Sequence, residues 1–246
     1  MPAGSNVLHG VRAYYLGEAG DGHVGRVNIS HAFYEVLGHD TYNALALRPV
    51  RINAQMAALE LSLDRDWIRY RTSFFYASGS RDPHDATARG FDSIVDNPNF
   101  GGGVFSYWNR ESINVTPNGI ALMNAGSLIP DLRPGKASGQ ANFVNPGLLL
   151  VNGGIDTNIT PKLRAFANLN LMRFVHTQPL EVLLQRPEIH SGIGADTGIG
   201  VRYRPLLTDN IILVVGLNRL FPFAGFRQIY PGGALYALFT SLRFQY

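Results

Sequence analysis

Cysteine is absent from the 246-residue chain, so the sequence offers no disulfide framework, no zinc site with thiolate ligands and no cysteine nucleophile. Lysine is almost absent: Lys136 and Lys162 stand against 19 arginines among the 21 basic residues. Charged residues make up 16%, against roughly 25% in average proteins. No run reaches the ~18 consecutive apolar residues of a membrane-spanning helix, which excludes a polytopic helical protein. A net charge of +3 is too small to indicate a nucleic-acid partner.

Signatures of enzymes and cofactors are also lacking. The glycine-rich stretch at residues 191–198 has neither the spacing nor the following helix of a dinucleotide-binding loop. Small residues on a crowded face explain it better. Asp82, His84 and Asp85 form an incomplete set of metal ligands, and there is no nucleophile elbow. We therefore predict a protein that is not an enzyme and that has no cofactor and no metal site.

What the sequence does have is alternation of apolar and polar residues with a period of two, which is typical of strands with one apolar face. In residues 193–204, Ile193, Ala195, Thr197, Ile199, Val201 and Tyr203 alternate with glycine, aspartate and arginine. Similar patterns predict nine strands of about twelve residues, longer than the usual five or six. They begin at Val7, Val24, Val50, Trp67, Gly147, Lys162, Ile193, Asn210 and Ala234.

Three local features qualify this pattern. The apolar positions change phase between Met56 and Leu59, which predicts a β-bulge near Ala57. A short helix is expected within residues 85–95, and an extra hairpin within residues 104–125 that turns at residues 117–119.

Short connections alternate with long ones along the chain, as in outer-membrane β-barrels. We therefore expect one all-β domain over residues 1–246, an antiparallel up-and-down transmembrane barrel or the C-terminal part of one. Residues 80–142 form a long loop that either constricts the lumen or makes an extracellular flap. Aromatic residues near the strand ends suit the two interfacial girdles: Tyr14, Tyr15, Phe75, Tyr76, Tyr203, Phe244 and Tyr246.

The last nine residues, Leu238-Phe-Thr-Ser-Leu-Arg-Phe-Gln-Tyr246, resemble the C-terminal assembly signal of Gram-negative outer-membrane barrels. The resemblance implies the cell outer membrane as location, membrane lipid as a partner, and recognition by the outer-membrane assembly machinery through Phe244 and Tyr246. In such barrels the strand number is even. Nine strands therefore mean that one is missing, that the count is wrong, or that the chain is part of a larger barrel. The absence of a signal-peptide pattern at the start favours the last of these.

The strand pattern and arginine placement across most of the chain loosely resemble alginate-export-type porins, a family of substrate-conducting barrels. Residues 81–100 look like a fixed loop motif of that broad family, without an assigned role. The resemblance implies a channel that passes a solute through a wide lumen.

The polar face of each strand would line such a lumen, and most of its charged residues are arginines. We predict these pore-lining residues: Arg12, Arg51, Arg69, Arg71, Arg164, Arg202, Arg204, Arg243, Asn168 and Asn170. Asp156 and Asp196 are the acids predicted to face inward. The arginines outnumber them, so the lumen would carry a net positive charge. The arginines would bind anions, and the amides would bind sugar hydroxyls.

Two interpretations of these arginines stay open. They conduct an anionic or sugar-like solute, or they pair structurally with acids on neighbouring strands or on the long loop. For the loop, the candidate acids are Asp82, Asp85, Asp92 and Asp96. A second functional hypothesis is a non-conducting barrel that acts as a scaffold or encloses a partner protein. A barrel enzyme and a soluble β-sandwich are weaker alternatives, since no catalytic site is legible and sandwich strands are shorter.

Overall fold

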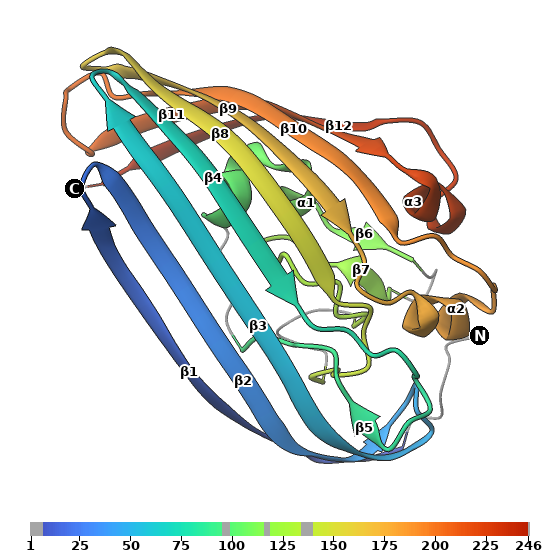
Figure 1. Ribbon diagram of the computed structural model, residues 1–246. Helices are drawn as coiled ribbons and strands as arrows, with labels where there is room; N and C mark the ends of the chain where they lie inside the picture. The colour runs from blue at the N-terminus through green and yellow to red at the C-terminus, as the bar shows by residue number, and fades with distance from the viewer. Residues whose placement is uncertain (1–6, 95–98, 116–118, 134–139, 246) are drawn as a thin grey trace.

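The computed structural model describes residues 7–94, 99–115, 119–133 and 140–245. Nine long strands dominate it (Figure 1). They are β1 (Val11–Val24), β2 (Val27–Asn43), β3 (Arg48–Arg65), β4 (Ile68–Ala77), β8 (Leu148–Thr160), β9 (Leu163–Arg173), β10 (Gly192–Tyr203), β11 (Ile211–Pro222) and β12 (Leu235–Phe244). Each predicted strand is present, and its start lies within a few residues of the expected one.

The long strands pair in chain order and antiparallel, which confirms the up-and-down arrangement. Within the described residues, β1 pairs only with β2 and β12 only with β11, so the sheet is not closed into a barrel. It curves strongly, and this gives it a concave and a convex face (Figure 1). Short turns join the strands at one end. At the other end lie the long connections, which contain α2 (Gln178–Leu184) and α3 (Ala224–Ile229).

Residues 78–147, here called the insertion, connect β4 and β8, and their described part lies against the concave face (Figure 1). The insertion carries β5 (Thr87–Ala88), η1 (Phe100–Phe105), α1 (Tyr107–Arg110), β6 (Ile113–Asn114) and β7 (Ala121–Met123). η1 contacts β4, β8, β9, β10 and β11, and α1 contacts β10, β11 and β12. The described residues of the insertion therefore cover part of the concave face of the sheet.

A hydrophobic core fills the space between the insertion and the concave face near the loop end. Trp108, Leu122 and Phe143 of the insertion are fully buried there, together with Ile52 and Leu150 of the sheet. Burying a large apolar side chain contributes about 1.5–3 kcal/mol. The insertion is thus a folded part of the domain.

Three local predictions are corrected. Register is continuous from Val27–Leu63 to Asp40–Val50 in the β2–β3 pair, so there is no bulge near Ala57. The phase change has another cause: Ile52 and Met56 face the insertion, whereas Leu59 faces outward. The expected helix is absent from residues 85–94, where β5 pairs with β3 instead. The extra hairpin forms only as the short β6–β7 pair, and most of its predicted turn lies outside the described residues.

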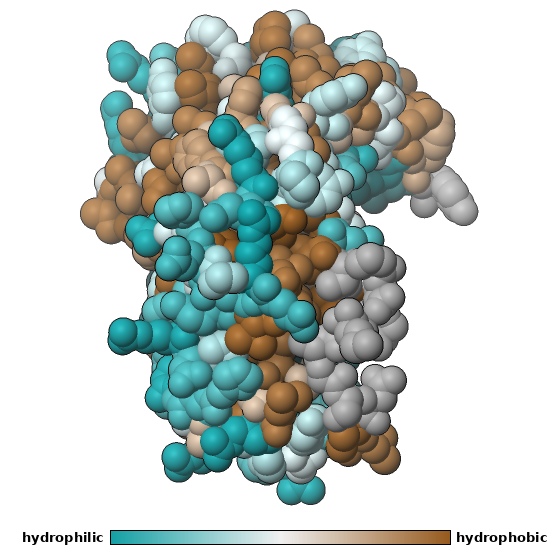
Figure 2. Space-filling model, turned by 90° about the vertical axis from the view of Figure 1, so that its right-hand side faces the viewer, coloured by the Kyte–Doolittle hydropathy of each residue, from teal (hydrophilic) through white to brown (hydrophobic). Residues whose placement is uncertain are grey.

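In the parts of the chain described, no helix combines the length and the apolar character needed to cross a membrane. The short helices α2 and α3 serve as connections at the loop end. Figure 2 views the right-hand side of Figure 1 and shows apolar residues gathered in a band beside hydrophilic ones. This side of the molecule is therefore not uniformly polar.

Candidate functional site

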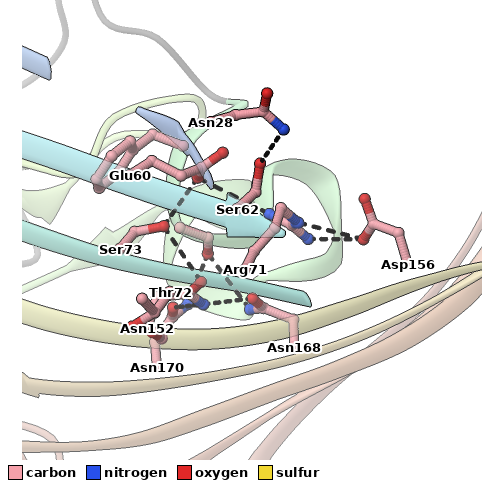
Figure 3. A network of polar contacts seen from close by, with 12 residues as sticks. Asn28, Glu60, Ser62, Arg71, Thr72, Ser73, Asn152, Asp156, Asn168 and Asn170 are labelled. Atoms are coloured by element: carbon pink, nitrogen blue, oxygen red, sulfur yellow. Dashed lines mark hydrogen bonds and ion pairs between the residues drawn. The ribbon is translucent and has the colours of Figure 1, made fainter. Parts of the chain in front are cut away.

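The concave face toward the short-turn end carries a cross-strand network of polar side chains (Figure 3). Adjacent strands place these residues opposite one another in two rows. One row holds Glu60, Ser73, Asn152, Asn170 and Asp196, and the next holds Asn28, Ser62, Arg71, Asn168 and Asn218. Alternation puts these residues on one face, because each strand contributes every second residue to it, and the strand register places them opposite one another.

Three of the predicted arginines face this network and bind carboxylates. Arg71 Nη2 lies 2.9 Å from Asp156 Oδ1, and Arg164 Nη2 lies 2.8 Å from Asp156 Oδ2. Arg69 Nε lies 2.5 Å from Asp64 Oδ1, at the turn between β3 and β4. Asp156 is 7% exposed, so its pair with the largely buried Arg71 is shielded from solvent, whereas Arg164 is one-third exposed. For these three arginines the geometry supports the structural interpretation.

Arg202 and Arg243 also lie on the concave side, near the short turns, and form no ion pair with a carboxylate among the described residues. Arg202 stands opposite Arg164 in the β9–β10 register, and both guanidinium groups approach the ring of Phe166, at 5.6 Å and 5.2 Å. Arg164, Arg204 and Arg243 all act electrostatically on Arg202. Arg204 follows β10, with its Nη1 3.3 Å from Asp209 Oδ1. This end of the face is therefore strongly basic.

The buried asparagines hold the insertion. Asn170 Nδ2 donates to Gly101 O at 2.8 Å, and Asn168 Nδ2 donates to the same oxygen at 3.3 Å. Asn218 Nδ2 donates to Val104 O at 2.9 Å. Asn170 is fully buried and also donates to Asp196, and Asn168 is 7% exposed and accepts a hydrogen bond from Asn152. In this structure both amides anchor the insertion.

Asp196 anchors the start of α1. Its carboxylate accepts hydrogen bonds from the Ser106 hydroxyl, from the backbone N–H of Tyr107 at 2.9 Å and from Asn170 Nδ2 at 3.1 Å. The side chain is fully buried. A buried carboxylate with several donors is stabilised without a cation. Asp196 is thus on the inner face as expected, but as a binding point for the insertion.

Glycines on the same face let the insertion approach closely. A Cβ at Gly198 would lie 1.7 Å from Phe105 O, and one at Gly200 would lie 2.2 Å from the Phe105 ring. Phe105 stacks on Phe166, with 4.7 Å between ring centroids, and also contacts Phe239. The prediction of small residues on a crowded face agrees with this packing.

Some predicted positions are wrong. Arg12 and Arg51 lie on the convex face, because Val11, Ala13 and Ile52 beside them face the core. On the loop side of β1 and β3 the apolar residues point inward to meet the insertion, so polar residues there point outward. Two girdle aromatics, Tyr15 and Phe75, likewise face inward. Tyr14, Tyr76, Tyr203 and Phe244 share the convex rows, and Tyr246 lies outside the described residues.

Among the described residues, Asp85 and Asp92 form ion pairs with arginines of the insertion. Asp92 lies 3.1 Å from Arg133 within the insertion, and Asp85 lies 2.8 Å from Arg89, which lowers the pKa of the Asp85 carboxyl. Asp82 accepts a hydrogen bond from the backbone N–H of His84. Asp96 lies outside the described residues. Within the described ranges, no group of three or more acidic, histidine or cysteine side chains is placed to hold a metal ion.

Sequence reasoning missed the partners that the insertion supplies, Phe105 and Ser106 above all. The run of three glycines at residues 101–103 was an available signal, since all three adopt positive φ and this allows the chain to lie close to the sheet.

No protein-family model and no curated protein matches the chain.

Proposed function

We propose that the chain is part of an outer-membrane β-barrel, in which further strands pair with β1 and β12. The convex face supports this proposal. Large apolar side chains are exposed along its rows on β3, β4 and β8 to β12: Leu59, Leu63, Tyr70, Phe74, Val151, Ile155, Leu169, Leu171, Ile199, Leu217, Leu238 and Leu242. Water-soluble proteins rarely expose a contiguous apolar surface of this extent. Facing hydrocarbon, the same side chains would be stabilised.

These exposed apolar side chains, here called the apolar belt, lie at different heights on different strands, and this also supports a barrel. On β1 the exposed apolar residues of this face are Tyr14 and Leu16 along the strand and Val24 at its turn. The cross-strand row through Tyr14 meets β3 at Asn53, and the row through Val24 meets β3 at Leu63. The row through Leu238 of β12 meets β3 at Leu63. The pair Tyr14 and Leu16 therefore lies nearer the loop end than the belt on β12, whereas Val24 shares the row of Leu238. Strands inclined by ~35–45° to the axis of a barrel would shift the belt along the strands in this way.

On β1 and β2 the convex face also carries Glu18, His31 and Glu35, so the continuous belt extends from β3 to β12. At the loop end of β3 the convex residues become polar: Arg51, Asn53 and Gln55. We place the outer boundary of the hydrocarbon near Ala57. The short turns would then lie on the periplasmic side and the long connections outside.

We further propose that the barrel passes anionic or sugar-like solutes. One observation carries this: Arg202 and Arg243 form a basic group on the concave side without a carboxylate partner among the described residues. Arg164 stands opposite Arg202 and adds positive charge beside the group, while its own Nη2 is paired with Asp156. Guanidinium groups bind carboxylates in two-point contact and favour anions in a pore.

Conductance in planar bilayers under a salt gradient tests this function. The reversal potential of the wild-type protein should show anion preference, and Arg202→Ser with Arg243→Ser should reduce that preference. The matched control is Arg12→Ser with Arg51→Ser, which removes two positive charges from the convex face and should leave selectivity unchanged. Cation preference contradicts the arginine-lined path. A folded barrel that does not conduct favours instead a scaffold around a partner protein.

A further inference from the structure

A second feature of the concave face is a cavity of about 650 Å³ between the insertion and strands β1 to β4. It is separate from the basic group, which lies across the sheet on β9, β10 and β12. Binding pockets for small molecules have volumes of about 300–1,000 Å³ and predominantly apolar walls with a few polar groups. The cavity meets both criteria.

Aromatic rings from both sides line this cavity. The sheet contributes Tyr15, Tyr34 and Phe75, and the insertion contributes Phe91 and Phe100. Tyr15 meets Phe91 edge to face at 6.3 Å, and Phe75 meets Phe100 at 5.9 Å. The walls are thus fixed by contacts between the sheet and the insertion. Edge and face positions on such rings are favourable for another aromatic ring.

The residues with polar side chains that line the cavity are Tyr15, Asp21, Ser30, His31, Tyr34 and Ser93. The Tyr15 hydroxyl is already used, since it donates to Asp92 O at 2.8 Å. The Tyr34 hydroxyl forms no hydrogen bond with another described residue. Asp21 and Ser30, opposite each other on β1 and β2, lie at the end toward the hairpin turn. Beside the five Tyr and Phe rings of the lining, these groups can fix a polar substituent of a mainly apolar ligand.

We propose that the cavity binds a small aromatic molecule carrying one hydroxyl group. The ring would lie between Phe75 and Phe100 on one side and Tyr15 and Phe91 on the other, with the hydroxyl toward Tyr34. This goes beyond a pore for anionic or sugar-like solutes and does not depend on it, because the walls come from the domain itself.

The test uses the cysteine-free chain in detergent micelles. Ala32→Cys places a thiol in the cavity wall, and Ser241→Cys places one on the concave side of β12 as a control. The rate of N-ethylmaleimide labelling is measured with and without 2-naphthol. Labelling at position 32 should slow several-fold, and labelling at position 241 should not change. No protection, or equal protection at both positions, overturns the proposal. Ser30→Cys gives a second reporter if Ala32→Cys fails to fold.

Tyr34→Phe tests the hydroxyl contact. It should raise the 2-naphthol concentration for half-protection by about five- to tenfold, the effect of one lost hydrogen bond. Protection by naphthalene, which lacks a hydroxyl, should not change. Equal effects on both compounds contradict the assigned orientation. Because these readouts do not use conductance, they are independent of the proposed channel.

Discussion

The strongest mutational prediction concerns Gly198, where the sheet and the insertion are closest. A Cβ there would lie 1.7 Å from Phe105 O, and real Cβ contacts are essentially never below 3.0 Å. In Gly198→Ala the Phe105 carbonyl must therefore move by at least ~1.3 Å. The shift disturbs the Phe105–Phe166 stack and the hydrogen bond from Asn218 to Val104 O.

The cost can be worked from these contacts. Burial of Phe105 contributes about 2 kcal/mol and the Asn218 hydrogen bond about 1 kcal/mol. Overpacking without detachment costs about 1–3 kcal/mol. We expect Gly198→Ala to lower the free energy of opening the insertion by about 2–3 kcal/mol. This corresponds to a rise of about thirty- to a hundredfold in the opened population.

Hydrogen–deuterium exchange of peptides covering residues 100–110 measures this opening. Exchange there should accelerate in Gly198→Ala, while β2–β3 peptides change little. Gly153→Ala is the matched control, because a Cβ at Gly153 meets nothing within 4 Å. If Gly198→Ala exchanges like Gly153→Ala, the insertion is not held at this point and the interpretation of the glycine row is refuted.

Three further predictions concern stability. Asp156→Asn removes the carboxylate that Arg71 and Arg164 share, so thermal unfolding should show a destabilisation of about 3 kcal/mol. A change below about 0.5 kcal/mol contradicts the buried-pair interpretation. Asn170→Ala should raise exchange in η1 but not in β6–β7, since it removes the anchor to Gly101 O; equal exchange in both regions argues against local anchoring. Burial, then repulsion from Arg81, lowers the pKa of His176, so the native state binds its proton less tightly than the unfolded state. Stability should therefore fall as pH drops below about 6.5, and His176→Gln should reduce that slope; an unchanged slope refutes this assignment.

Strand positions could be predicted from sequence because alternation directly reflects which face each residue occupies. The choice of face failed where its physical cause differs along one strand. Within residues 59–63 of β3 the apolar side chains face outward, whereas the side chains of Ile52 and Met56 face inward and pack against the insertion. A rule that polar residues face the lumen therefore placed Arg51 on the wrong side. The same reversal misplaced Arg12.

The chemistry of the concave face was predicted only in part. Asp156, Asp196, Asn168 and Asn170 were assigned to the correct face, but their partners come from other strands or from the insertion. Long-range pairs such as Asn170 with Gly101 O join residues 69 positions apart, and alternation carries no information about them. The Phe105 contact likewise depends on how the insertion folds.

Site-directed spin labelling in lipid vesicles tests the central claim, lipid contact of the convex face, most directly. Single cysteines replace Ile155, Leu169 and Leu217, which are exposed on that face, and Asn53→Cys on its polar part is the control. Nitroxides at the first three positions should collide more with oxygen than with a water-soluble nickel complex, and the label at position 53 should show the reverse. Nickel access equal to that of position 53 at all three apolar positions would contradict a membrane-facing surface.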